Sequence, residues 1–166
     1  MVEISRLERD ALNRIEAMTD PAALRTQIGN ARRKGSGVVE RAAFARLCHV
    51  QPEATPGTVE HDVWQSIHAL EERLKDERGK TVRLSRTRQK IAKDGEAKTA
   101  ADLTLKREAS DGFRDLIERD LPQLTFEAVV LRHPKTFDDE VLAAARQRLA
   151  SAGVDPDAFN PVIQGG

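Results

Sequence analysis

Apolar residues recur at three- and four-residue steps through the first part of the chain, which is the periodicity of amphipathic helices. A first stripe covers residues 4–18, and a second follows Asp20 and Pro21, which are typical of a helix N-cap and first helical residue. The second helix is expected to end at the Gly-Ser-Gly of residues 35–37, and a third helix follows it. The pattern therefore predicts an N-terminal helical unit over residues 1–50. Its apolar positions are Leu7, Ala11, Ile15, Leu24, Ile28, Ala31, Val39, Ala43 and Leu47.

A longer apolar seam follows the Pro- and Gly-containing linker at residues 51–57. Its four-three spacing predicts one long helix from about Thr58 to Asp94, which would either pair with a second chain or pack in the core of a monomer. Gly79 costs about 1 kcal/mol relative to alanine inside a helix, so a break between Gly79 and Thr81 is the alternative. The seam consists of Val63, Ile67, Leu70, Leu74, Glu77, Thr81, Leu84, Arg88 and Ile91.

Shorter helices are predicted beyond the seam. Gly95 ends the long helix, and Thr99 with Asp102 three residues later matches a capping box for a short helix. A further helix begins near Asp111. Residues 124–133 combine Val-rich strand character with helical spacing, and helix is favoured because no second strand is predicted to pair with this segment.

The last predicted helix is capped by Thr136 with Asp139, and the tail at residues 154–166 is expected to be loose. The sequence thus predicts an all-α fold of about seven helices. These are an N-terminal three-helix unit, a long central helix, and short C-terminal helices packed on it. Residues 1–50 and 57–153 are expected to form one compact domain overall.

Composition narrows the class of protein. Of the 166 residues, 33% are charged and 39% hydrophobic, and no apolar run approaches the roughly 20 residues of a membrane-spanning helix. The N-terminal sequence MVEISRLERD lacks the apolar centre of a secretory signal, so we expect a cytoplasmic protein that does not bind membranes. Cys48 is the only cysteine, which excludes an intrachain disulfide, and its neighbours Leu47 and Val50 predict a buried side chain.

Charge is distributed unevenly, although the net charge of the chain is zero. The segment 79–93, GKTVRLSRTRQKIAK, has no acidic residue. Its basic residues are Lys80, Arg83, Arg86, Arg88, Lys90 and Lys93. On a helix, four of them would lie within about one quarter of the circumference, opposite Leu84 and Ile91. These four are Arg83, Arg86, Lys90 and Lys93, and a basic ridge of this kind can lie along a phosphate chain.

This ridge has three candidate roles: contact with nucleic acid, a solvated helix face, or pairing with an acidic protein surface. The sequence favours a non-enzymatic DNA- or RNA-binding or accessory protein. Its phosphate contacts would extend to the second helix at Arg32, Arg33 and Lys34. Sequence preference would come from Arg88 or from the helix near Thr99. The alternative is a protein-interaction module or oligomeric adaptor, such as a homodimer, that pairs through the seam at residues 63–91.

A histidine- and carboxylate-rich stretch at residues 57–72 is a second candidate for chemistry. On a helix, His61 and His68 share a face but stand about 10 Å apart along the axis, so one metal ion cannot bind both. His68 and Glu72 supply two ligand positions and lack a third. We therefore predict helix surface here, with no metal and no cofactor, and an enzymatic function would rest on this cluster alone.

Overall fold

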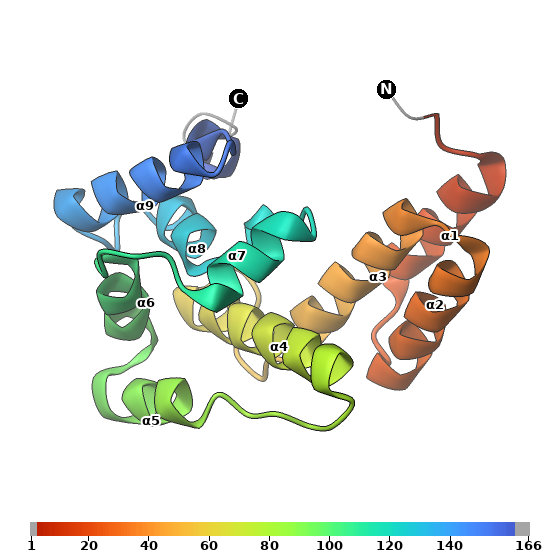
Figure 1. Cartoon of the computed structure of the whole chain (residues 1–166), viewed down its shortest axis with the longest axis horizontal. Helices are drawn as coiled ribbons and strands as arrows, with labels where there is room; N and C mark the ends of the chain where they lie inside the picture. Colours follow the sequence, from red (N-terminus) through yellow and green to blue (C-terminus); the bar gives the residue numbers. More distant parts are fainter. Residues whose placement is uncertain (1–2, 162–166) are drawn as a thin grey trace. The chain divides into compact units, whose positions relative to one another are not determined.

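The computed structural model describes residues 3–161, which form nine α-helices and two short 3-10 helices and contain no strand (Figure 1). The all-α fold class is therefore confirmed. The chain divides into two compact units, Met1–Pro52 and Glu53–Gly166. Among the helices of residues 3–161, none combines the length and the apolar composition needed to cross a bilayer.

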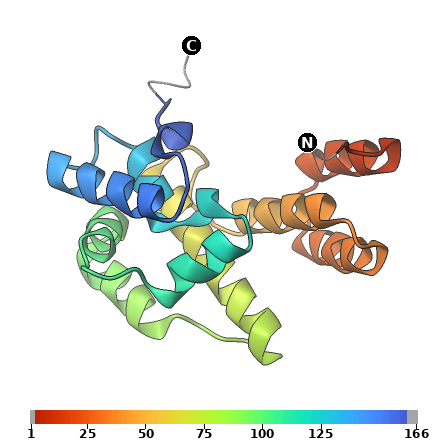
Figure 2. The ribbon, with the colours of Figure 1, turned by 45° about the horizontal axis from the view of Figure 1, so that its top comes forward.

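Three helices form the N-terminal unit. They are α1 (Arg6–Ala17), α2 (Pro21–Lys34) and α3 (Gly37–Val50). Both α1 and α2 pack against α3, as Figure 2 shows, and the apolar positions predicted from the sequence face this contact except Leu7, which is 81% exposed. Buried side chains at the contact are Ile15, Leu24, Ile28, Ala31, Val39, Ala43 and Leu47. Cys48 is fully buried beside them, which confirms the prediction for this residue.

Polar side chains cap the beginnings of the three helices of this unit, and the cap at Asp20 is the one that the sequence predicted. Ser5 and Glu8 form a capping box at α1, and the Asp20 carboxylate accepts a hydrogen bond from the Ala22 N–H at the start of α2. The Ser36 hydroxyl, which caps α3, donates to Glu8 Oε2 at 2.6 Å. This bond joins the beginnings of α1 and α3, so the two caps also fix how these helices pack.

The C-terminal unit contains the remaining elements. They are α4 (Val59–Arg78), α5 (Ser85–Asp94), α6 (Glu96–Thr104), α7 (Asp111–Glu118), η1 (Pro122–Leu124), α8 (Phe126–Arg132), α9 (Asp139–Ser151) and η2 (Pro156–Phe159). Helix α8 lies at the centre, because it contacts α4, α6, α9 and both 3-10 helices. Its residues Ala128 to Leu131 are each at most 3% exposed. The stretch that combined strand and helix character is therefore a helix buried on every side, which explains its nearly continuous apolar sequence.

The predicted long helix is interrupted at Gly79. This residue adopts φ 71° and ψ 13°, a left-handed conformation that suits glycine and ends α4. The chain resumes helical structure at Ser85, so α4 and α5 are separate helices and the break falls where the alternative interpretation placed it. Several seam residues are packed inside the C-terminal unit, since Val63, Ile67 and Ile91 are buried in its core.

Two predicted caps and the predicted tail differ from the structure. Thr99 is fully buried in the middle of α6, because that helix already begins after Gly95. Helix α9 is capped by Asp138 and not by Thr136, since the Asp138 carboxylate accepts from the Val141 N–H. Residues 156–159 form η2, which packs against α8 and α9, so this part of the tail is ordered. The remaining predicted tail, residues 162–166, lies outside the described residues.

The Gly79 break yields a first prediction. Replacing Gly79 by alanine places a Cβ in the left-handed region and should lower the free energy of unfolding of the C-terminal unit by about 1 to 2 kcal/mol. Gly79→Asn should cost less, because asparagine tolerates this conformation. Denaturant unfolding followed by the fluorescence of Trp64, the single tryptophan, reports on this unit. A Gly79→Ala protein as stable as the wild type would contradict the role given to this glycine.

Candidate functional site

The basic segment 79–93 is partly extended and partly helical in the structure. Arg83 precedes α5 and is not helical, whereas Arg86, Lys90 and Lys93 lie on α5 itself. These three share one side of the helix, since their spacing is four and three residues. The predicted four-residue ridge on a single helix is therefore corrected to three residues on α5, with Arg83 in the connector before it.

Arg88 points toward α4 instead of solvent. Its guanidinium binds both carboxylate oxygens of Glu71, each at 2.7 Å, and lies over the ring of Trp64 at 5.1 Å from the ring centroid. The same Glu71 carboxylate accepts a hydrogen bond from the Leu84 N–H at 2.8 Å. Arg88 thus holds α5 against α4, and its guanidinium is not placed to read a base sequence.

The charge state of Glu71 follows from these contacts. Burial pushes the pKa of Glu71 upward, but the hydrogen bonds from Arg88 and from the Leu84 N–H outweigh it, so the pKa of Glu71 is lowered. The hydrogen bond to Glu71 likewise raises the pKa of Arg88. Both groups are therefore charged at neutral pH, and the pair is a bidentate ion pair with only 12% of the Glu71 side chain exposed.

Lys90 forms ion pairs with two carboxylates, one on α5 and one on α6. Its ammonium group lies 2.9 Å from an oxygen of Asp94 and 2.7 Å from an oxygen of Asp102, so it joins α5 to α6. Hydrogen bonds to Asp102 and Asp94 raise the pKa of Lys90. Asp102 also accepts from Lys98 at 3.1 Å. Lys90 therefore belongs to a surface network of alternating charges that links two helices.

Four cations of the segment remain without such contacts. They are Lys80, Arg83, Arg86 and Lys93, and all four are exposed. Within residues 3–161, their side chains make no hydrogen bond or ion pair to another residue. The exposed face of α5 consists of Ser85, Arg86, Gln89, Ala92 and Lys93, with no carboxylate among them. The structure thus leaves a short basic surface with two cations on the helix and two in the connector.

Arg32, Arg33 and Lys34 lie in the last turn of α2, in the N-terminal unit. Basic residues at this end complement the negative end of the helix dipole. Arg32 binds Glu40 at 2.7 Å, and the Arg33 guanidinium donates to the side chain of Asn30. The expectation that these three residues extend the phosphate-binding surface stays a prediction.

The histidine-rich stretch forms a charged cluster that the sequence did not indicate. Asp62 on α4 accepts a 2.6 Å bond from His133 Nε2 and a 3.3 Å bond from Arg132 Nε, which joins α4 to the end of α8. Burial by itself would raise the pKa of Asp62, but the opposite effect of the Arg132 charge and the His133 hydrogen bond is larger. The pKa of Asp62 is therefore lowered. His61 is only 1% exposed, so its prediction as helix surface was wrong. Within residues 3–161, no three His, Cys, Asp or Glu side chains are grouped to hold a metal ion.

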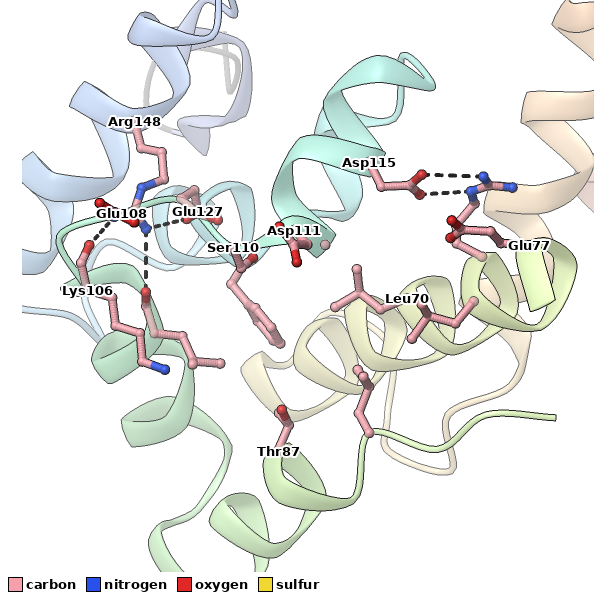
Figure 3. Close-up of a pocket in the computed structure, with 16 residues that line it drawn as sticks. Leu70, Glu77, Thr87, Lys106, Glu108, Ser110, Asp111, Asp115, Glu127 and Arg148 are labelled. Atoms are coloured by element: carbon pink, nitrogen blue, oxygen red, sulfur yellow. Dashed lines mark hydrogen bonds and ion pairs between the residues drawn. The ribbon is translucent and has the colours of Figure 1, made fainter. Parts of the chain in front are cut away.

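An apolar cavity of about 480 Å³ lies in the C-terminal unit, beside the basic segment (Figure 3). Its apolar lining comes from α4, α6, α8 and the connector before α5. These residues are Leu70, Leu74, Leu84, Leu103 and Phe126. At one wall α7 approaches α4 so closely that a Cβ on Gly112 would meet Leu70 Cδ2 at 2.6 Å. Leu84 and Thr87 connect this cavity to the segment that carries the exposed cations.

Two ion pairs frame the cavity, and Figure 3 draws both as dashed lines. Arg73 binds the two oxygens of Asp115 at 2.9 and 3.4 Å. Arg148 binds Glu127 at 2.9 Å and donates to the carbonyl oxygen of Lys106. Burial raises the pKa of Glu127, which the Arg148 contact only partly offsets. Because each partner lies more than 20 residues away in the chain, no local sequence pattern could have paired them.

Comparison with protein-family models, with curated protein sequences and with solved structures finds no match to this chain. The function is therefore inferred from the surface and the cavity themselves.

The Glu71 contacts yield a second prediction. Glu71→Gln removes the charge that binds Arg88, and should lower the free energy of unfolding of the C-terminal unit by about 2 kcal/mol at neutral pH. Because the pKa of Glu71 is lowered in the fold, its contribution is present above its ordinary pKa of 4.5 and is lost as the pH falls through the folded value. The gap between wild type and variant should therefore shrink on acidification.

Glu118 provides the control, since its side chain is exposed and, within residues 3–161, has no hydrogen bond or ion pair. Glu118→Gln should change stability by less than about 0.5 kcal/mol. Denaturant unfolding at several pH values, followed by Trp64 fluorescence, measures both variants. The role of Glu71 is disproved if Glu71→Gln is as mild as Glu118→Gln, or if the gap widens at low pH.

Proposed function

We propose that this chain is a non-enzymatic nucleic-acid-binding or accessory protein that contacts the phosphate backbone through the connector and exposed face of α5. The main observation behind the proposal is that some cations of the basic segment are paired with carboxylates and others are exposed. Arg88 and Lys90 hold the segment on α4 and α6, whereas Lys80, Arg83, Arg86 and Lys93 are exposed and make no hydrogen bond or ion pair among the described residues. The hydrogen bond from Lys90 lowers the pKa of Asp94, and Lys93 is near enough to that carboxyl to lower its pKa further. A cytoplasmic location, expected from the sequence, is consistent with this role.

Fixing the segment in place favours binding of a polyanion. The bidentate Glu71–Arg88 pair and the Lys90 contacts restrain α5, so Arg86 and Lys93 are presented about 10 Å apart along one helix face before any ligand arrives. Two long side chains on a fixed backbone lose less conformational freedom on binding than the same side chains on a flexible loop. Charge attraction to phosphate then supplies most of the affinity.

Binding of this kind is expected to be independent of base sequence. Arg88 is engaged by Glu71, and Thr99 is fully buried, so neither residue is presented to a base edge. Contacts to phosphate alone position a protein on nucleic acid without carrying sequence information. We therefore expect a dissociation constant of about 10⁻⁴ to 10⁻⁶ M at physiological salt, the usual range for non-specific binding.

Pairing through the seam at residues 63–91 has less support. Val63 and Ile67 are fully buried in the core of the C-terminal unit, and Ile91 is 5% exposed. Leu70 and Leu74 line the cavity. Since these apolar side chains already pack within their own unit, a second chain could reach them only if the unit opened.

The proposal predicts a steep dependence of binding on salt. Four phosphate contacts on duplex DNA correspond to a slope of about −3.6 in log K against log salt. Fluorescence anisotropy with labelled duplex DNA, single-stranded DNA and RNA, at about 50 and about 200 mM salt, measures this slope and ranks the three ligands. Failure of all three to bind at the lower salt concentration would refute the proposal.

A charge-matched pair of variants locates the binding surface. Replacing Arg86 and Lys93 by glutamine should weaken binding across all sequences and reduce the slope by about 2. The control replaces Arg107 and Lys135, which are exposed and have no hydrogen bond or ion pair within residues 3–161, and so makes the same change in net charge. Equal losses in both double variants would show that net charge alone drives binding, and would remove α5 from the proposal.

A further inference from the structure

The cavity of the C-terminal unit has the volume and lining of a small-molecule site. Its volume of about 480 Å³ falls within the usual range for ligand pockets, about 300 to 1,000 Å³. Four leucines and one phenylalanine form its apolar wall, and charged and polar side chains make up the rest of the lining. Sites of this kind bind the apolar body of a ligand, while a few polar groups set its orientation.

The cationic groups of the lining are poorly available to an anionic ligand. The Arg73 guanidinium is bound by Asp115 and by Asp76, and only 9% of its side chain is exposed. The Arg148 guanidinium is bound by Glu127 and by main-chain carbonyl oxygens. Capturing a carboxylate or phosphate would require breaking one of these charge pairs, which leaves a buried carboxylate without its partner and is costly.

Acidic groups are available instead. Glu77 and Glu108 are exposed at the edge of the cavity, and within residues 3–161 neither makes a hydrogen bond or ion pair. Figure 3 shows them at opposite sides of the lining, with Leu70 between them. Lys106 beside Glu108 is the one cation of the described lining that has no carboxylate partner. The groups at the edge that remain able to bind a ligand charge are therefore mainly acidic.

We propose that this cavity binds an aliphatic amine, with its hydrocarbon chain among the leucine side chains and its ammonium group at Glu77 or Glu108. An alkylammonium group is charged at neutral pH, as a lysine side chain is, and forms charge-assisted hydrogen bonds with carboxylates. The apolar wall buries the chain, which supplies affinity. The acidic edge selects against anions of the same length. This ligand carries no phosphate, so the proposal is independent of nucleic-acid binding.

Three ligands of equal chain length test the charge preference. Octylamine, octanoate and octanol are titrated into the full-length protein and followed by isothermal titration calorimetry. Octylamine should bind at least about tenfold more tightly than octanoate, since the carboxylates at the edge form charge-assisted hydrogen bonds with an ammonium group and repel a carboxylate. Absence of octylamine binding, or octanoate or octanol binding as tightly as octylamine, would overturn the proposal.

Two pairs of variants place the ligand in the cavity. Leu103→Trp fills the lining and should reduce octylamine affinity at least about tenfold, whereas Leu105→Trp, two residues away and outside the lining, should leave it unchanged. Glu77→Gln with Glu108→Gln should also weaken octylamine binding about tenfold without altering the apolar wall. Its control, Glu60→Gln with Glu118→Gln, removes the same charge from exposed positions outside the lining.

The surface variants keep the test informative if Leu103→Trp does not fold, because Glu77 and Glu108 are exposed and neither makes a hydrogen bond or ion pair within residues 3–161. Circular dichroism confirms the helical content of each protein before titration. Equal binding by the Glu77 and Glu108 double variant and its control would refute the assignment of the ammonium position. Equal loss in Leu103→Trp and Leu105→Trp would refute the assignment of the cavity.

Discussion

The carboxylate of Glu71 makes the main polar attachment of the basic segment to α4. Because α4 ends at Gly79, α5 is not a continuation of that helix. Side-chain contacts therefore hold α5 against α4. The N-terminus of α5 has no side-chain cap of its own. Glu71 supplies a hydrogen-bond acceptor for the Leu84 N–H at this point and binds Arg88 one turn later. One residue of α4 thus helps to cap α5 and to orient it.

Local signals in the sequence were sufficient for most helices. The capping by Asp20 and the ending of α2 at Gly35 were predicted because each depends on residues within a few positions of one another. Helical periodicity likewise identified the apolar faces of α1 and α4. The predicted seam continued past Gly79 because Leu84 and Ile91 keep the four-three spacing, with Thr81 and Arg88 at the positions between. Periodicity alone therefore could not decide between one helix and two.

The candidate site was predicted less completely, for a physical reason. The charge run of residues 79–93 was visible, but which cations would face solvent depended on carboxylates elsewhere in the chain. Arg88 finds its partner 17 positions earlier, and the His133 contact with Asp62 spans 71 positions. Such pairs form only when helices pack, so no local pattern in a single sequence indicates them. The cavity beside the segment has the same origin, since its lining comes from α4 to α9 and the segments that join them.

The connector between α4 and α5 is a place where the chain can change in length at little cost in stability. Its residues from Lys80 onward join two helices that Glu71 already holds together, so the length of the connector contributes little free energy. Doubling a flexible loop costs only about 0.6 kcal/mol. Insertions in this stretch are therefore expected to cost little, and each could change how many cations stand beside α5 while the helix keeps its place. Replacing Glu71 or Arg88 alone, by contrast, would leave its partly buried partner without its ion pair.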